Sequence, residues 1–209
     1  MEIAILGTGR VGRVLGRRWA AAGHTVAFGS RTPGTAGNAE LGALEGVSVM
    51  TPLEAVAGAD IAVLATPWSA AEDVIASLDS LDGKILIDCT NPVGPNFTFE
   101  GKLGASGAER IAAKATGARV VKALNTTGAQ NMAAPIVVGK NRLVMFICGD
   151  DDHAKQVVAG LVEQLGFEVA DAGGLAQAYY LETLAMLWIS QAFGRGWGSD
   201  FGFSILRRA

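Results

Sequence analysis

Residues 2–12 read Glu-Ile-Ala-Ile-Leu-Gly-Thr-Gly-Arg-Val-Gly, an apolar run followed at once by the pattern G-x-G-x-x-G. The run predicts a buried strand, and the apolar spacing after it predicts a helix over 11–22. Between a strand and a helix, Gly7 permits a tight turn, Gly9 lets the backbone approach a pyrophosphate, and Gly12 lets the helix pack closely on the strand. The N–H groups at the helix start then face the phosphates. The stretch predicts a dinucleotide-binding turn, with a glycine turn that binds no ligand as the alternative.

Outward from this stretch, short apolar runs alternate with helical patterns along the chain. The alternation predicts an α/β fold of the Rossmann type, with a doubly wound, mostly parallel sheet and right-handed crossovers. We expect a dinucleotide-binding domain over 1–172 and a small helical C-terminal lobe over 173–209. Ser69 is expected to cap its helix. Further strands are expected at 25–28, 47–50, 61–65, 84–89, 119–124, 143–148 and 167–170, further helices at 52–57, 69–78, 105–115, 150–165 and 175–193, and a loop at 29–38.

Composition excludes several classes of protein. The chain has 209 residues, half of them hydrophobic, and a net charge of -3, so it lacks the basic surface of a nucleic-acid binder. Cys89 and Cys148 each end an apolar run, which favours buried free thiols and a reducing, cytoplasmic location without a secretory signal. The apolar stretch over 175–193 is interrupted by Gln177, Glu182 and Gln191, so we expect a buried or dimer-facing helix rather than a membrane span.

The end of the second expected strand indicates which dinucleotide is bound. An NAD site usually carries an acidic residue there, about 20 residues after the glycines, to bind the ribose hydroxyls. This chain has Phe-Gly-Ser-Arg-Thr over 28–32 and no acid. Ser30 can donate to a 2′-phosphate, Arg31 can pair with it or stack on the adenine, and Arg10 can add a second positive charge. The segment predicts NADP(H); a solvated Arg31 is the alternative.

Three later strand ends are expected to line a pocket around the nicotinamide, because ligands of open α/β sheets lie beyond the carboxyl ends of the strands. Each end places small polar groups beside proline or apolar residues. Trp68 is equally compatible with a role as a core aromatic residue. The residues expected to contact the cofactor here are Ala65, Thr66, Pro67 and Trp68, then Asn91, Pro92 and Val93, then Asn125 and Thr126.

Groups for acid–base or metal chemistry are scarce in the sequence. His24 and His153 fall away from the expected crevice, and the chain has no His/Cys metal spacing. The acidic run 150–152 suits a helix start, with a metal site as the alternative. Lys122 is the one strand-end candidate for a proton donor, and a structural lysine is the favoured interpretation. Hydride transfer between two stacked rings needs no such donor, so we predict no catalytic side chain and no metal.

These motifs, taken together, run nearly end to end and resemble those of a known family. They are Ile5-Leu6-Gly7-Thr8-Gly9 with Val11-Gly12, Ser30-Arg31, Ala65-Thr66-Pro67-Trp68, Lys122-Ala123-Leu124-Asn125-Thr126, Cys148-Gly149-Asp150-Asp151-Asp152, and Asp171-Ala172-Gly173 followed by Leu181-Glu182 and Leu184. The chain resembles the NADP-dependent oxidoreductases of the deazaflavin coenzyme F420.

The resemblance implies roles for particular residues. Thr8, Arg10 and Val11 would hold the pyrophosphate, and Ser30 with Arg31 the 2′-phosphate. The deazaflavin would stack on the nicotinamide near 91–93, 125–127 and the start of the last helix, and hydride would pass directly between the rings. Members of the family tend to be homodimers with C-terminal helices at the interface, so the C-terminal lobe would complete both the acceptor pocket and the dimer.

Two loops are closer to a broader group of bacterial and metalloreductase-like relatives. They are Asn91-Pro92-Val93-Gly94 and Asn125-Thr126-Thr127-Gly128. The small-molecule redox acceptor therefore stays open at this stage. The alternatives are an NADPH-dependent reductase of a flavin, an imine or a carbonyl compound, and a non-catalytic protein that senses NADP(H).

Overall fold

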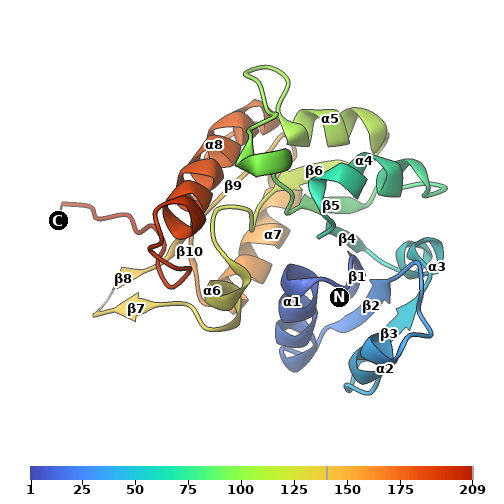
Figure 1. Ribbon diagram of the computed structural model, residues 1–209. Helices are drawn as coiled ribbons and strands as arrows, with labels where there is room; N and C mark the ends of the chain where they lie inside the picture. Colours follow the sequence, from blue (N-terminus) through green and yellow to red (C-terminus); the bar gives the residue numbers. More distant parts are fainter. Residues whose placement is uncertain (140, 209) are drawn as a thin grey trace.

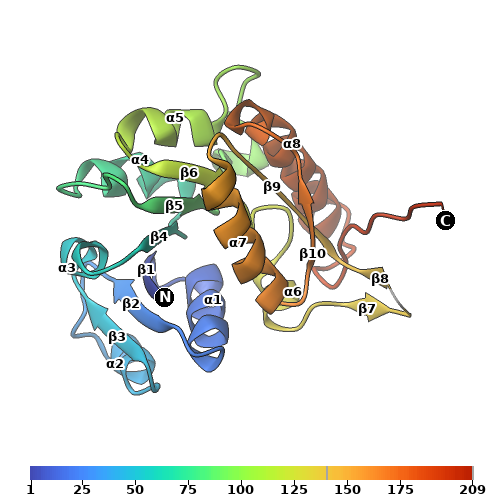
Figure 2. The same ribbon diagram turned by 180° about the vertical axis from the view of Figure 1, so that it is seen from behind.

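The computed structural model, which describes residues 1–139 and 141–208, is built on one large sheet (Figures 1 and 2). Its strands are β1 (Glu2–Leu6), β2 (Thr25–Gly29), β3 (Val47–Met50), β4 (Ile61–Leu64), β5 (Ile85–Asp88), β6 (Arg119–Lys122), β9 (Val144–Gly149) and β10 (Glu168–Asp171). The helices are α1 (Arg10–Ala21), α2 (Ala36–Gly42), α3 (Pro52–Ala57), α4 (Trp68–Ala76), α5 (Gly107–Lys114), α6 (Ala129–Ala133), α7 (Asp152–Gln164) and α8 (Ala178–Ile189).

The strand order is β10-β9-β6-β5-β4-β1-β2-β3. Strands β1 to β6 are parallel, β9 is antiparallel to β6, and β10 is parallel to β9. The expected α/β fold of the Rossmann type is therefore confirmed. The order reverses at β1, where β2 lies on one side and β4 on the other, and ligands of such sheets bind at this switch point.

The alternation of side chains along the strands divides the core into two layers. In β1, Ile3 and Ile5 face one side of the sheet, and Ala4 and Leu6 face the other. The first layer packs against α1, α6 and α7, and the second against α3, α4, α5 and α8. A helix on each face explains why the strands are nearly continuous apolar runs.

Two local expectations were wrong. Helix α4 begins at Trp68, with Pro67 as its N-cap, so Ser69 lies in the first turn and caps nothing. The expected loop over 29–38 contains the start of α2, whose Gly- and Asn-rich sequence gives little helical signal. Tertiary hydrogen bonds hold this helix: Arg13 Nη2 donates to the carbonyl of Gly37, and the Asn38 amide donates to Ser30 Oγ.

The last part of the chain packs back on the sheet and then leaves it. After a 3₁₀ turn at Leu175–Gln177, α8 continues into a π-helical turn at Ser190–Gly194. The final residues extend away from the body of the molecule (Figure 1). The hairpin of β7 (Val137–Val138) and β8 (Asn141–Arg142) projects on the same side. No helix in the described part of the chain is both long and apolar enough to cross a membrane.

Candidate functional site

The glycine turn after β1 has the geometry that a phosphate-binding turn needs. Gly7 has a φ of 124°, and a Cβ there would lie 2.6 Å from the carbonyl oxygen of Ala65. A Cβ at Gly12 would collide with the carbonyl oxygen of Gly7, so α1 can approach β1 only without a side chain at this position. A Cβ at Gly9 would meet nothing within 4 Å, which leaves open space where the backbone can approach a ligand.

The start of α1 is free to bind an anion. Gly9 is the N-cap residue, it offers no side-chain cap, and the first turn carries no acidic residue. The first N–H groups of the helix therefore remain available as hydrogen-bond donors, and they lie at the positive end of the helix dipole. Arg10 is exposed at the first helical position, and Val11 packs partly on the core. Together these features fit the pyrophosphate of a dinucleotide.

The end of β2 presents a hydroxyl whose proton is still available. Ser30 is buried, and its Oγ accepts from the N–H of Thr32 (3.2 Å) and from Asn38 Nδ2 (3.0 Å). A hydroxyl has two acceptor positions and one donor, so the Ser30 proton remains for an external acceptor. Arg31, next to it, is exposed. A hydroxyl donor beside an exposed guanidinium is the pair that a 2′-phosphate would require.

Arg13, which the sequence motifs did not indicate, connects these two parts of the site. Arg13 Nε donates to the carbonyl of Thr8 (2.8 Å), and its Nη2 donates to the carbonyl of Gly37 (3.0 Å). One guanidinium thus joins the glycine turn to the start of α2 and fixes their spacing. Its place one turn into α1, on the side of the glycines, is the only signal in the sequence that could have indicated it.

The ends of β4, β5 and β6 meet at the same edge of the sheet, as predicted. Asn91 Nδ2 donates to the carbonyl of Asn125 (2.8 Å), and Asn125 Nδ2 donates to Asn91 Oδ1 (3.0 Å). Leu124 has a φ of 60°, a left-handed conformation that costs energy for a branched residue, and such strain concentrates where ligands bind. Thr66 Oγ1 is buried and has no hydrogen-bond partner in the described part of the chain.

Trp68 lines a cavity of about 490 Å³ with Val93, Glu100 and Arg110. The indole Nε1 donates to Glu100 Oε2 (3.1 Å), and the Arg110 guanidinium lies 4.7 Å from the ring centroid. The ring also packs on the core layer that contains α4 and α5. The core interpretation of Trp68 is therefore confirmed for one part of the ring, and its contact with the cofactor stays a prediction. Pro92 is buried beside Gly107, at the start of α5.

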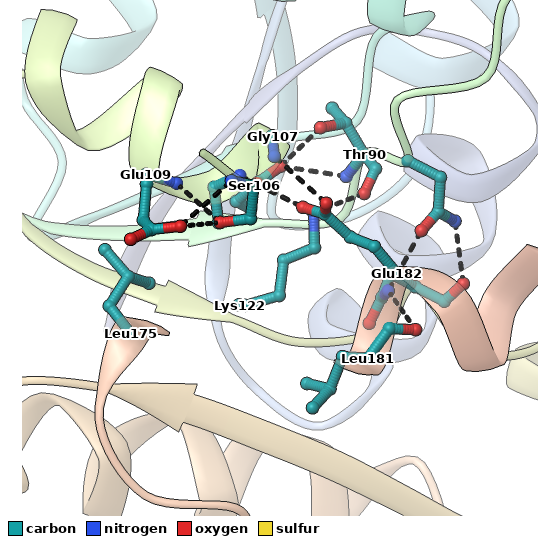
Figure 3. Close-up of polar contacts among 12 residues, drawn as sticks. Thr90, Ser106, Gly107, Glu109, Lys122, Leu175, Leu181 and Glu182 are labelled. Atoms are coloured by element: carbon teal, nitrogen blue, oxygen red, sulfur yellow. Dashed lines mark hydrogen bonds and ion pairs between the residues drawn. The ribbon is translucent and has the colours of Figure 1, made fainter. Parts of the chain in front are cut away.

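Lys122 is fully buried in a cluster of charges that the sequence did not reveal (Figure 3). Its Nζ lies 2.9 Å from Asp88 Oδ2 and 3.1 Å from Glu182 Oε1. Glu182 comes from α8, and its two carboxylate oxygens also accept from the N–H groups of Gly107 and Ala108, each at 3.0 Å. Asp88 Oδ1 accepts from the N–H and the hydroxyl of Thr90. These bonds leave Lys122 as a structural lysine, and they exclude it as an exposed proton donor.

The other candidate groups also have structural partners. Asp151 caps α7 through Ala154 N (2.7 Å), Asp150 accepts from Leu175 N (2.7 Å), and Asp152 pairs with Lys155 (3.1 Å). The acidic run is thus a helix start, and the residues that the structure describes contain no group of three or more potential metal ligands.

The two cysteines are free, with Cys148 buried and Cys89 partly buried. Burial, reinforced by the charge of Asp88, raises the pKa of the Cys89 thiol far above its usual value, and burial raises the pKa of Cys148 to about 12. At neutral pH both are therefore thiols, which are poor nucleophiles.

Comparison with known proteins places this geometry in a family. A family model described as "NADP oxidoreductase coenzyme F420-dependent" matches residues 2–92. The F420-dependent NADP reductase of Methanothermobacter thermautotrophicus is 32% identical over 91% of this chain and 88% of its own length. Metalloreductase STEAP3 of Rattus norvegicus is 31% identical over 88% of this chain, which spans only 36% of that protein.

Solved structures agree with this placement. A protein of Arthrobacter sp. FB24, provisionally named an F420-dependent NADP reductase, superposes with a TM-score of 0.89 at 33% identity and covers 99% of this chain and 100% of its own. A reductive aminase of Aspergillus terreus in complex with NADPH and ethyl levulinate superposes with a TM-score of 0.69 at 24% identity, over 93% of this chain and 62% of its own, and shares the fold. The chain therefore belongs to the family of F420-dependent NADP oxidoreductases, and it is an enzyme of NADP-linked oxidation and reduction.

Proposed function

We propose that the protein transfers hydride directly between NADP(H) and the deazaflavin coenzyme F420. The observation that carries the proposal is the state of Lys122: the strand-end residue best suited to give a proton is buried between two carboxylates. The neighbouring segments 65–68, 91–93 and 125–127 carry hydroxyl, amide, apolar and aromatic side chains and no titratable one. The side chains of these three segments can line a site for flat rings but include no acid or base of their own, which suits transfer between rings.

The protein's own part in this reaction is to bind and orient. When bound, NADPH supplies a hydride, and the oxidised deazaflavin accepts that hydride together with a proton from solvent. The start of α1 would hold the pyrophosphate, while Ser30 and Arg31 would hold the 2′-phosphate. Asn91, Asn125 and Thr66 would surround the nicotinamide at the carboxyl ends of β4 to β6. We propose that residues 173–209 close the acceptor side of the crevice.

The preference for NADP(H) should depend on Arg31. Arg31→Ala should weaken the binding of NADP⁺ about tenfold, the low end of the range for a charge-assisted hydrogen bond because Arg31 is exposed. Binding of NAD⁺ should change little, because it has no 2′-phosphate. Titration calorimetry with both dinucleotides measures the two effects. Equal losses for NADP⁺ and NAD⁺ would refute a role at the 2′-phosphate.

The acceptor is tested by mixing the protein with NADPH and oxidised coenzyme F420 and following the absorbance of both. We expect NADPH and the oxidised deazaflavin to be consumed in equal amounts. A folded sample that binds NADPH but leaves coenzyme F420 unchanged over a wide range of pH would overturn the proposal. Turnover with a flavin, an imine or a carbonyl compound instead would identify a different reductase, and binding without turnover by any of them would identify a sensor of NADP(H).

We further propose a cytoplasmic homodimer. Large apolar side chains are exposed on and after α8, at Tyr180, Leu187, Phe193 and Trp197. Exposed apolar patches of this kind usually mark an interface, and a symmetric dimer is the commonest assembly that would cover one. Two free cysteines and no disulfide are compatible with a reducing compartment.

A further inference from the structure

The side-chain amides of Asn91 and Asn125 form a hydrogen-bonded chain whose orientation is fixed. Asn91 Nδ2 donates to the main-chain carbonyl of Asn125, so Asn91 Oδ1 must be an acceptor. Asn125 Nδ2 then donates to this Oδ1 (3.0 Å) and to the carbonyl of Leu181 (3.3 Å). Both partners of Nδ2 are acceptors, so exchanging the two ends of the Asn125 amide would break both bonds.

These hydrogen bonds leave one acceptor atom of Asn125 without a partner among the described residues. Asn125 is 4% exposed, and its Oδ1 is buried and has no hydrogen-bond donor within the part of the chain that the structure describes. Buried polar atoms of native proteins are almost always hydrogen-bonded, and an exception calls for a ligand or a water molecule. The free atom is an acceptor, so its missing partner is an N–H or O–H group.

The position of Asn125 indicates which group this is. Asn125 follows β6, which is separated from β1 by β5 and β4, a distance of about 14 Å at the usual strand spacing. The glycine turn follows β1, and the Ser30–Arg31 pair lies on the opposite side, after β2. A dinucleotide with its 2′-phosphate over β2 and its pyrophosphate over β1 therefore directs its nicotinamide toward β4, β5 and β6. The nicotinamide carries one N–H donor group, its carboxamide.

We propose that Asn125 Oδ1 accepts a hydrogen bond from the nicotinamide carboxamide and so makes Asn125 the residue that fixes the rotation of the ring about its glycosidic bond. The inference rests on NADP(H) binding in the proposed function, and it is independent of the acceptor. Because Asn125 Nδ2 is held by Leu181 of α8, the same amide couples the position of the last helix to the orientation of the ring. That orientation decides which face of the nicotinamide meets the acceptor.

The test compares NADP⁺ with its 3-acetylpyridine analogue, in which a methyl ketone replaces the carboxamide and removes the N–H donor. Titration calorimetry on the full chain without any acceptor gives both dissociation constants. The wild-type protein should bind NADP⁺ about tenfold more tightly than the analogue, as expected for one hydrogen bond. Asn125→Ala should bind both with nearly equal affinity, and Asn125→Ser, whose hydroxyl is too short to reach, should behave in the same way if the alanine variant fails to fold.

A matched control separates recognition from general damage. Asn131 is also buried, and its Nδ2 donates to the carbonyl of Phe201 (2.8 Å) and to Thr127 Oγ1 (2.8 Å). Asn131→Ala should keep the tenfold preference whatever it does to stability. A preference that is absent from the wild type, or unchanged in Asn125→Ala, would overturn the inference and leave a buried water as the partner of Oδ1. Failure to bind NADP⁺ at all would instead overturn the proposed function.

Discussion

Replacing Lys122 with methionine should lower the free energy of unfolding by about 3–5 kcal/mol, the usual cost of removing one partner from a buried ion pair. Methionine fills a similar volume, so little of this loss comes from a cavity. The cost arises because Asp88 and Glu182, both fully buried, would be left close together with no cation between them. Urea denaturation followed by circular dichroism measures the change.

An exposed ion pair provides the control for this prediction. Arg207 pairs with Glu168 at 2.7 Å, but the Arg207 side chain is 67% exposed, so Arg207→Ala should cost at most about 1 kcal/mol. A similarly small cost for Lys122→Met would show that the buried cluster is not a stabilising unit. A Lys122→Met protein of unchanged stability that binds NADPH but has lost turnover would return Lys122 to the role of a proton donor.

The same cluster predicts how stability depends on alkaline pH. Burial alone would lower the pKa of Lys122, but the charges of Asp88 and Glu182 outweigh burial and hold it above its usual 10.5. A group whose pKa is higher in the folded state stabilises the protein fully below its unfolded pKa and stops doing so as pH rises through the folded pKa. The stability of the wild type should therefore fall more steeply above pH 10.5 than that of Lys122→Met, as measured by urea denaturation across a pH series.

The cluster also shows what the sequence could and could not predict. The turn at Gly7, Gly9 and Gly12 is a local signal, because all three glycines act within one strand–helix unit, and it led directly to the fold. Glu182 accepts a hydrogen bond from the N–H group of Gly107, 75 residues away, and no local sequence pattern predicts that contact. Asp88 in an otherwise apolar strand gave a partial signal, since a buried carboxylate needs a cation. Only the packing of α8 on α5 shows where the second carboxylate comes from.

Replacing Gly12 should impair both folding stability and NADP⁺ binding, whereas replacing Gly9 should impair binding alone. This difference tests the assignment of the glycine turn. Gly12→Ala should destabilise the protein by about 1–3 kcal/mol, because the new Cβ would collide with the carbonyl oxygen of Gly7 and lie 3.2 Å from Ile5 Cγ2. Gly9→Ala should leave stability nearly unchanged, because a Cβ there meets nothing within 4 Å and the φ of -77° suits any residue. Both should weaken NADP⁺ binding more than about a hundredfold.

Gly9→Ala should affect binding and not stability, because no protein atom in the described part of the chain lies beside Gly9 but a bound pyrophosphate would. If the pyrophosphate lies over the start of α1, its oxygens must approach the Gly9 backbone closely, and a methyl group would hold them away from the N–H donors. Urea denaturation with and without NADP⁺ gives stability and binding together, because a ligand that binds only the folded state stabilises it in proportion to its affinity. Gly58→Ala, also in open space but far from the turn, should change neither. If Gly9→Ala binds NADP⁺ as the wild type does, the pyrophosphate lies elsewhere, and the assignment of the glycine turn is wrong.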